Sequence, residues 1–291
     1  MYKKQIGAVL IVFAIMVYLF LQPVKGLIKS KEAGGHTDAP AQQARAVVNV
    51  TVDMVSSAAK IAIGPGLSAQ INDTEAQLKN ATDDAAKLDL QKKLAKEWDD
   101  VNQPAPAAFY YQAVAGKENT FDAWVAAGSH FNDAFNSIQD TTAQPALVND
   151  AIECYGNAAK LQPENLDAKT GLGVAYVNQF SLGIGQDGGP PKGVMLLLDV
   201  VRQDPKNINA NLSLGKLAVT SRQYDKAIPR FKTVIAQEKV PSFEPHFYLA
   251  ECYRQLGMKK EAIDAYQQSR KLMPDTAVDR RIDEYIKELK N

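Results

Sequence analysis

The sequence predicts an all-α protein with an N-terminal anchor helix, a region of helical hairpins and a solenoid of repeated helix pairs. Two stretches near the C-terminus match at a separation of 35 residues, so that Leu214 and Gly215 correspond to Leu249 and Ala250. A separate unbroken apolar run occupies residues 6–21. Elsewhere apolar residues recur at helical spacing, and no pair of alternating segments suggests a sheet. The three observations together favour helices throughout the 291 residues.

The apolar run has the features of a membrane segment. Lys3 and Lys4 precede it, and Lys25, Lys29 and Lys31 follow it. Its residues, at about 1.5 Å each, span about 24 Å, a little less than the ~30 Å core of a bilayer, and flanking lysines can snorkel. We therefore predict an uncleaved signal anchor at residues 1–26 and a polar linker at 27–43. The alternative is a signal peptide cleaved near residues 24–26, where the small-residue pattern is poor.

The expected orientation of the anchor in the membrane rests on the length of the N-terminal tail rather than on the charges that flank the apolar run. The lysines on the two sides of the run are nearly balanced, so the positive-inside rule discriminates little. A short tail before a large domain favours a cytoplasmic N-terminus. We expect a single-pass membrane protein with its repeats outside the cytoplasm, in the periplasm if the protein is bacterial. Cleavage would instead give a secreted or periplasmic protein.

Residues 44–103 are predicted to form an N-terminal helical region. Residues 45–63 fit both a strand alternation and a helical stripe, and the Ala-rich flanks favour the helix. A Gly-Pro-Gly sequence at 64–66 then breaks the chain. From Leu67 to Leu88 apolar and small residues step by four and three, as in a short heptad pattern. We favour one helix of a hairpin that packs on the first repeat, and the alternative is a dimerising coiled coil.

Residues 104–274 are predicted to hold the repeats. The two clearest units contain Leu214–Gly215, Ala218, Ala227 and Phe231, then Leu249–Ala250, Tyr253, Ala262, Tyr266 and Pro274. Ala227 and Ala262 are expected where the two helices of a unit approach most closely. Two earlier units contain Trp124, Ala127–Gly128, Phe131, Ala151, Tyr155, Ala158 and Pro163, then Leu172–Gly173, Tyr176, Gly193, Leu197, Val200 and Pro205. Their extra residues, 136–149 and 181–192, have loop composition.

A more eroded fifth unit precedes these four. Its first helix would include Leu90, Leu94 and Trp98, and its second helix residues 106–111. After the last unit, residues 275–291 contain an amphipathic stretch rich in Arg, Glu and Lys. Such a segment is typical of the polar helix that caps the end of a solenoid.

The spacing of these residues resembles the tetratricopeptide repeat family, whose pattern is Trp, Leu-Gly and Tyr in one helix, then Ala, Phe and Pro. The resemblance covers residues 104–274 and implies a right-handed superhelix with a concave groove lined by the first helix of each repeat. Several members of the family bind a protein or peptide in that groove. The bacterial single-span members that associate with translocation machinery have a similar architecture.

The resemblance also implies which residues line the groove. On the last two units these are Asn209, Leu212, Lys216, Glu244, Phe247, Glu251 and Arg254. On the earlier two units they are Asp122, Val125, Ser129, Asp167, Thr170 and Val174. Phe247 and Arg254 are the best hot-spot candidates, because aromatic and Arg side chains are enriched there. The Lys and Asn positions of a carboxylate clamp are not matched, which argues against that role.

Composition and motifs argue against several other functions. The 33 basic and 33 acidic residues give no net charge, so nucleic acid is not expected as a partner. Cys154 and Cys252 fall in different repeats and are expected to pack as small apolar residues. The Gly183–Gly188 motif lies in a predicted loop, without the strand that a dinucleotide site requires. The three histidines have no metal-ligand spacing, so no catalytic residue, metal or cofactor is predicted.

The sequence therefore predicts a membrane-tethered scaffold rather than an enzyme. Its partner would be a protein or peptide bound in the groove, and its setting would be envelope assembly or protein translocation. The alternative is a structural membrane protein that associates with itself as a homo-oligomer through the 67–88 heptads. A remote alternative is an enzyme with an unrecognised site.

Overall fold

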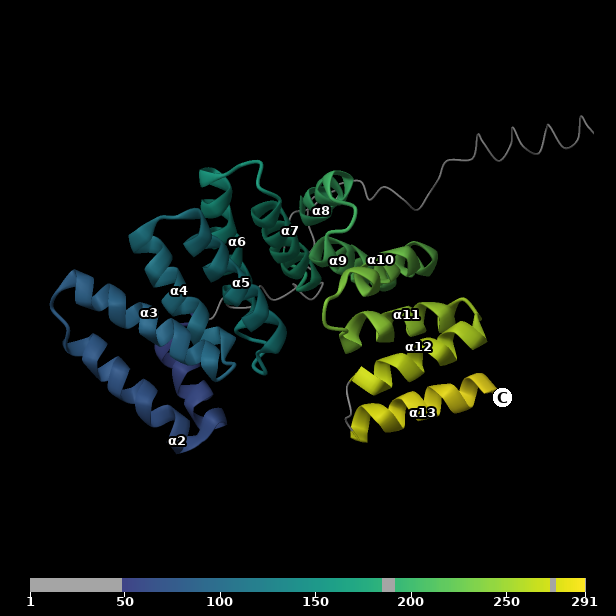
Figure 1. The fold of residues 1–291 in the computed structure, drawn as a ribbon, viewed down its shortest axis with the longest axis horizontal. Helices are drawn as coiled ribbons and strands as arrows, with labels where there is room; N and C mark the ends of the chain where they lie inside the picture. The colour runs from purple at the N-terminus through teal and green to yellow at the C-terminus, as the bar shows by residue number, and fades with distance from the viewer. Residues whose placement is uncertain (1–48, 185–191, 273–275, 291) are drawn as a thin grey trace, which may run out of the picture. The chain divides into compact units, whose positions relative to one another are not determined.

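The computed structural model describes residues 49–184, 192–272 and 276–290, and in these ranges the chain forms twelve helices and no strand. The helices are α2 (Val52–Asn80), α3 (Asp84–Asp100), α4 (Pro104–Glu118), α5 (Phe121–Ser137), α6 (Gln144–Leu161), α7 (Leu166–Ser181), α8 (Lys192–Gln203), α9 (Ile208–Thr220), α10 (Tyr224–Gln237), α11 (Phe243–Gln255), α12 (Lys259–Leu272) and α13 (Thr276–Lys290). The prediction of an all-α fold is confirmed for this part of the chain (Figure 1).

The chain divides into two compact units, Met1–Ala46 and Val47–Asn291. The predicted anchor at 1–26 and the linker at 27–43 belong to the first unit and lie outside the described residues. Within the described ranges, every helix is too short or too polar to cross a bilayer.

Helix α2 confirms the preference for a helix over a strand from Val52 onward. Thr51 begins it by accepting a hydrogen bond from the backbone N–H of Met54. The helix is kinked at Gly64, whose φ of 79° is accessible to glycine at little steric cost. Glu75 joins the two halves, because its carboxylate accepts hydrogen bonds from Ser56 at 2.7 Å and from Lys60. The Gly-Pro-Gly sequence thus breaks the helix, as predicted, and the two halves of α2 fold back on each other.

The heptad pattern at 67–88 does not form one helix, so the coiled-coil alternative across this segment is wrong. Helix α2 ends at Asn80, and Asp83 begins α3 by accepting a hydrogen bond from the backbone N–H of Ala86 at 2.8 Å. Ile71 and Thr74 of the expected seam are 1% and 0% exposed within a single chain. The packing on the first repeat is as expected, because α2 packs on α3 and α4, but the segment is divided between two helices and does not form the single helix predicted.

Five consecutive helix pairs follow, as the repeat period predicts: α3 with α4, α5 with α6, α7 with α8, α9 with α10, and α11 with α12. Small residues lie at the crossings, since Ala227 and Ala262 are both 0% exposed. A Cβ added at Gly193 of α8 would lie 2.5 Å from the carbonyl oxygen of Gly173 on α7. The right-handed turn of the solenoid stays a prediction.

One predicted loop is much shorter than expected. The sequence predicts a loop at 136–149 because Pro145 and polar residues interrupt the pattern, but α5 continues to Ser137 and α6 begins at Gln144. Pro145 lies in the first turn of α6, where proline is tolerated because the N–H it lacks would have no partner in the helix. The second predicted loop, 181–192, lies between α7 and α8, and residues 185–191 of it are outside the described ranges.

Helix α13 occupies the predicted capping position and packs on α12 through Ile282 and Ile286, which are 0% and 8% exposed. Both cysteines are buried and free, as expected for residues that serve packing. Burial raises the pKa of the Cys252 thiol to about 11, with a smaller contribution from Glu251, so the thiol stays protonated at neutral pH.

Candidate functional site

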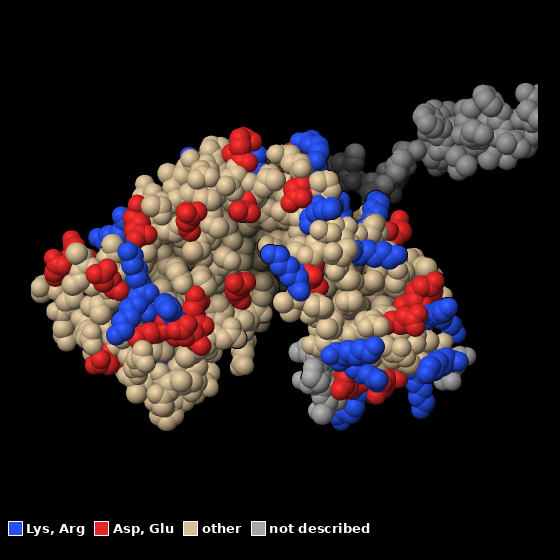
Figure 2. Space-filling view, viewed as in Figure 1, with Lys and Arg blue, Asp and Glu red and all other residues tan. Residues whose placement is uncertain are grey.

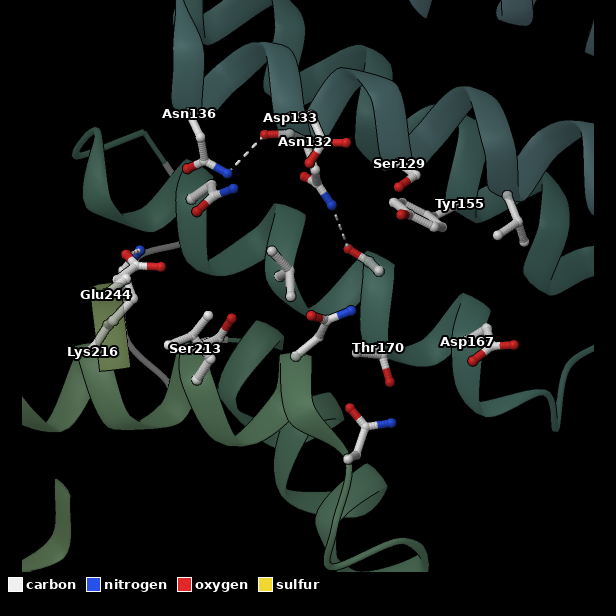
Figure 3. A pocket seen from close by; sticks show the side chains of 17 residues that line it. Ser129, Asn132, Asp133, Asn136, Tyr155, Asp167, Thr170, Ser213, Lys216 and Glu244 are labelled. Atoms are coloured by element: carbon white, nitrogen blue, oxygen red, sulfur yellow. Dashed lines mark hydrogen bonds and ion pairs between the residues drawn. The ribbon is translucent and has the colours of Figure 1, made fainter. Parts of the chain in front are cut away.

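A groove of about 640 Å³ crosses the first helices of successive repeats (Figure 3). Helices α5, α7 and α9 supply most of its surface, and α6 and α11 add one residue each. The lining residues are Val125, Ser129, Asn132, Asp133, Asn136, Tyr155, Asp167, Thr170, Gly171, Val174, Asn178, Asn207, Asn209, Leu212, Ser213, Lys216 and Glu244. Asparagine is the commonest residue among them, so the surface is rich in paired amide donors and acceptors.

Two glycines allow α5 and α7 to approach the Tyr155 ring closely from either side. A Cβ at Gly128 of α5 would lie 2.7 Å from Cδ2 of Tyr155, and a Cβ at Gly171 of α7 would overlap the other side of the ring. Tyr155 is 5% exposed, and its burial raises the pKa of the phenol to about 12. The glycine at each position is therefore required by close packing.

Three buried polar atoms on the groove have no hydrogen-bond partner in the structure. They are Oδ1 of Asn132, Oγ1 of Thr170 and Nδ2 of Asn178. The Asn132 and Thr170 residues are only 7% and 4% exposed. The other amide atom of Asn132 donates to the carbonyl oxygen of Gly171 at 3.4 Å, which holds the side chain between α5 and α7. Buried polar groups in proteins are nearly always hydrogen-bonded. Each of these three atoms can therefore form a hydrogen bond that the described part of the chain does not supply.

The charges on the groove are unevenly paired. Lys216 and Glu244 form an ion pair at 2.7 Å and lie together at one end of the view in Figure 3. Asp133 and Asp167 take part in no ion pair of the described residues. The concave surroundings of the Asp133 carboxylate reduce its hydration and raise its pKa, and the Asp99 charge raises it further while His130 opposes the shift. Asp133 is exposed at its tip, so the groove presents it to a ligand.

A second, smaller hollow of about 270 Å³ shares Asp133 and Asn136 with the groove. It extends to the turn between α3 and α4 and is lined by Asp99, Asn102, Gln103, Pro104, His130, Asp133, Asn136 and Ser137. We call it the acidic hollow. Asp99 accepts a hydrogen bond from the Tyr111 hydroxyl at 2.8 Å and lies 3.3 Å from Nδ1 of His130, whose ring stacks on Tyr111.

The groove contains four of the seven residues predicted for it on the last two units: Asn209, Leu212, Lys216 and Glu244. On the earlier units it contains Val125, Ser129, Asp167, Thr170 and Val174, but not Asp122. The residues Phe247, Glu251 and Arg254 do not line it.

These three residues face the end of the solenoid, where α12 and α13 engage them. The Phe247 ring packs against Tyr266 of α12 at 6.0 Å between centroids. Glu251 accepts hydrogen bonds from the Tyr266 hydroxyl and, at 2.7 Å, from Arg254. The Arg254 guanidinium lies 5.0 Å from the ring centroid of Tyr285 on α13. We call this network of α11, α12 and α13 the cap cluster.

The prediction missed the amides at the C-terminal ends of α5 and α7, namely Asn132, Asn136 and Asn178, together with Asp133. A signal for the α5 residues is present in the sequence. Ser129, Asn132, Asp133 and Asn136 are spaced by three, four and seven residues, which places them on one polar stripe of a helix. The stripe reaches Asn136 because α5 stays helical as far as Ser137, inside the segment predicted as a loop.

No group of three or more His, Cys, Asp or Glu side chains in the described ranges is arranged to hold a metal ion. The glycine-rich motif at 183–188 falls largely outside the described ranges. What the described fold and site define is a helical repeat protein with a polar groove across its first helices.

Comparison with known proteins gives this class a family description. Residues 212–275 match a family model described as tetratricopeptide repeat. The fold is similar to a thermophilic tetratricopeptide repeat protein of Thermus thermophilus, with 20% identity, a TM-score of 0.51, and coverage of 68% of this chain and 98% of that one. It is also similar to a chain of the APC/C hetero-tetramer Cut9–Hcn1, with 19% identity, a TM-score of 0.53, and coverage of 77% and 41%. No curated protein matches the sequence. Residues 212–275 thus match the tetratricopeptide repeat family, and the described part of the chain has a fold similar to that of tetratricopeptide repeat proteins.

Proposed function

We propose that this protein is a membrane-tethered scaffold that binds a protein or peptide partner in the groove formed by α5, α7 and α9. The observation that carries the proposal is that Asn132, Thr170 and Asn178, which line an open groove across successive repeats, each hold a buried polar atom without a hydrogen-bond partner. A partner that supplied hydrogen bonds there would recover free energy that the free protein lacks.

The fold supports binding rather than catalysis. The solenoid repeats a packing unit and presents a long groove, which suits recognition of another chain. One neighbour in fold is a chain of a hetero-tetramer, so the same architecture serves protein association there. The residues that line the groove include no histidine or cysteine beside the carboxylates Asp133 and Asp167.

The tether rests on the sequence. The apolar run at 6–21 and its flanking lysines support a single-pass anchor, with the repeats on the extracytoplasmic side. Anchoring would confine the groove near the membrane and raise the effective concentration of a membrane-associated partner. A groove of modest affinity is then sufficient, which fits a role in envelope assembly or protein translocation.

The binding role is tested by comparing one substitution inside the groove with a matched one outside it. Asn209 and Asn149 are both exposed asparagines on helices, but only Asn209 lines the groove. Partners of the full-length chain, captured in mild detergent and quantified by mass spectrometry, should be lost with Asn209→Arg and retained with Asn149→Arg. A loss of about 2 kcal/mol corresponds to roughly 30-fold weaker binding. Equal recovery with the folded Asn209→Arg variant would exclude the groove as the binding site.

The tether is tested separately. An uncleaved anchor keeps the protein in the membrane fraction after high-salt and alkaline washing, with the N-terminus at the first residues of the sequence. N-terminal sequencing that begins at Leu27, with the protein in the soluble fraction, would establish cleavage instead.

A further inference from the structure

We infer that the groove takes an extended peptide segment that carries a Lys or Arg, with this side chain seated at Asp133 where the groove meets the acidic hollow. The inference rests on the proposed function and names the chemical class of its ligand. Two independent features carry it: the carboxylate of Asp133, which takes part in no ion pair in the described ranges and lines both the groove and the acidic hollow, and the unpartnered amide and hydroxyl groups of residues that line the groove.

The carboxylates define where a cation binds. Asp133 belongs to both the groove and the acidic hollow, and Asp99 lies across that hollow. The His130 imidazole next to Asp99 is its ion-pair partner only when protonated. Asp167 on α7 adds a further unpaired carboxylate along the groove, and the single lysine that lines the groove, Lys216, is held by Glu244. At Asp133 a ligand cation would meet a carboxylate that takes part in no ion pair among the described residues.

The size of the acidic hollow limits what can enter it. A space of about 270 Å³ suits one long side chain and is too small for a folded surface. A Lys or Arg side chain combines an apolar stem with a cationic head, so it can reach Asp133 and Asp99 from a backbone that stays in the larger groove.

The uncharged residues favour a peptide backbone over a bare cation. The Asn132 side chain, next to Asp133 in sequence, keeps its carbonyl oxygen free, while Thr170 and Asn178 keep a hydroxyl and an amide nitrogen free on the facing helix. These atoms are covered in the unliganded structure, so small side-chain rotations would bring them to a ligand. A peptide group offers one N–H and one C=O per residue, which matches such mixed donors and acceptors.

The arrangement of helices sets the ligand's conformation. The groove runs from α9 across α7 to α5 (Figure 3). The acidic hollow continues from α5 to the turn before α4. An extended segment contacts all of these walls with fewer residues than a helix needs, because an extended chain advances about 3.3 Å per residue whereas a helix advances about 1.5 Å. The face seen in Figure 2 carries acidic and basic side chains intermixed, so a local feature of the groove, rather than the net charge, would select a basic ligand.

The test is a selection of random linear peptides displayed on phage, using the full-length chain in mild detergent as target. Peptides that bind wild-type protein and not Asn209→Arg are groove ligands. We expect these peptides to be enriched in Lys or Arg at one position. A synthetic peptide from this set should bind Asp133→Asn about tenfold more weakly by fluorescence anisotropy, which equals about 1.4 kcal/mol. Replacing the basic residue of the peptide by Gln should weaken binding equally and remove the effect of Asp133→Asn.

The matched control is Asp122→Asn. Asp122 is an exposed aspartate on the same helix, but it lines neither the groove nor the acidic hollow, so affinity should not change. Groove ligands without enrichment of Lys or Arg, and insensitive to Asp133→Asn, would overturn the inference and leave the proposed function intact. If no peptide depends on the groove, the peptide class itself is wrong, and the capture experiment with Asn209→Arg then decides whether the groove binds a folded partner.

Discussion

Two faces of the solenoid use equivalent positions of the repeat in opposite ways. Along the groove, the first helices α5, α7 and α9 present polar side chains whose hydrogen-bonding atoms are partly unused. In the cap cluster, the same kind of helix, α11, presents Phe247, Glu251 and Arg254 to partners within the chain. The comparison teaches that a side chain on the first helix of a repeat can contact a ligand only when no later helix of the chain packs against that side chain.

The largest expected difference between the two faces is in stability. Tyr266→Ala should lower the free energy of unfolding by about 3–5 kcal/mol, because a fully buried ring in the cap cluster is removed. Urea denaturation followed by circular dichroism measures the change. Asn209→Ala on the groove serves as the comparison and should leave the midpoint nearly unchanged, since Asn209 is exposed. A midpoint unaffected by Tyr266→Ala would mean that α11, α12 and α13 do not form the cluster described.

A carboxylate in the cap cluster should stabilise the fold. Glu251 is 19% exposed at its side chain and accepts hydrogen bonds from Arg254 and Tyr266. Glu251→Gln keeps the size but weakens both bonds and leaves the arginine charge without its counterion. We expect a loss of about 2 kcal/mol in the free energy of unfolding. The same denaturation experiment checks it, and a gain in stability would show that the pair is dispensable.

Removing an unpartnered polar group from the groove should raise the free energy of unfolding rather than lower it. Thr170→Val replaces an unpartnered buried hydroxyl by a methyl group and is expected to stabilise the protein by about 1 kcal/mol while weakening ligand binding. Thr74 is the matched control, because it is also a buried helical threonine but donates to Glu97 at 3.1 Å. Thr74→Val should therefore destabilise. If the two valine variants shift the melting temperature in the same direction, the distinction between used and unused polar groups fails.

The smallest expected effect is the pH dependence from Asp133. Burial raises the pKa of its carboxyl above the ordinary 3.8, so the folded state binds the proton more tightly than the unfolded state does. Its contribution to stability is therefore largest at acid pH and is lost as pH rises through the raised pKa. Asp133→Asn should be slightly more stable than wild type at pH 7, with the difference gone below pH 3.8. Melting curves across this range provide the measurement, and a difference that grows toward acid pH would contradict it.

The repeat architecture could be predicted from sequence because close packing restricts residue type. Ala227 and Ala262 are small because their helices touch, and this requirement recurs in every unit. The heptad spacing at 67–88 predicted a single helix. This prediction was wrong because spacing alone does not show where a helix ends, and Asp83 begins a new helix within the pattern. The loop predicted at 136–149 was too long because proline occurs both in the first turn of a helix and after its end, and Pro145 lies in the first turn of α6.

The site was only partly predictable. Family positions predicted Asn209, Leu212, Lys216 and Glu244, which line the groove, and their role in partner binding stays a prediction. Arg254 does not line the groove, because the resemblance describes a continuing array and contains no information about α13, whose Tyr285 lies beside Arg254. They also omitted Asn136, which lines the groove only because α5 extends one turn further than the loop prediction allowed.

The Tyr155 ring between two glycines has a mechanical consequence for the array. A β-carbon at position 128 or 171 would overlap the ring, so α5 and α7 come as close to Tyr155 as their backbones allow. A larger residue at either position would push its helix away from the ring. Because each repeat packs on its neighbour, one tyrosine of α6 thus sets how far apart two walls of the groove stand.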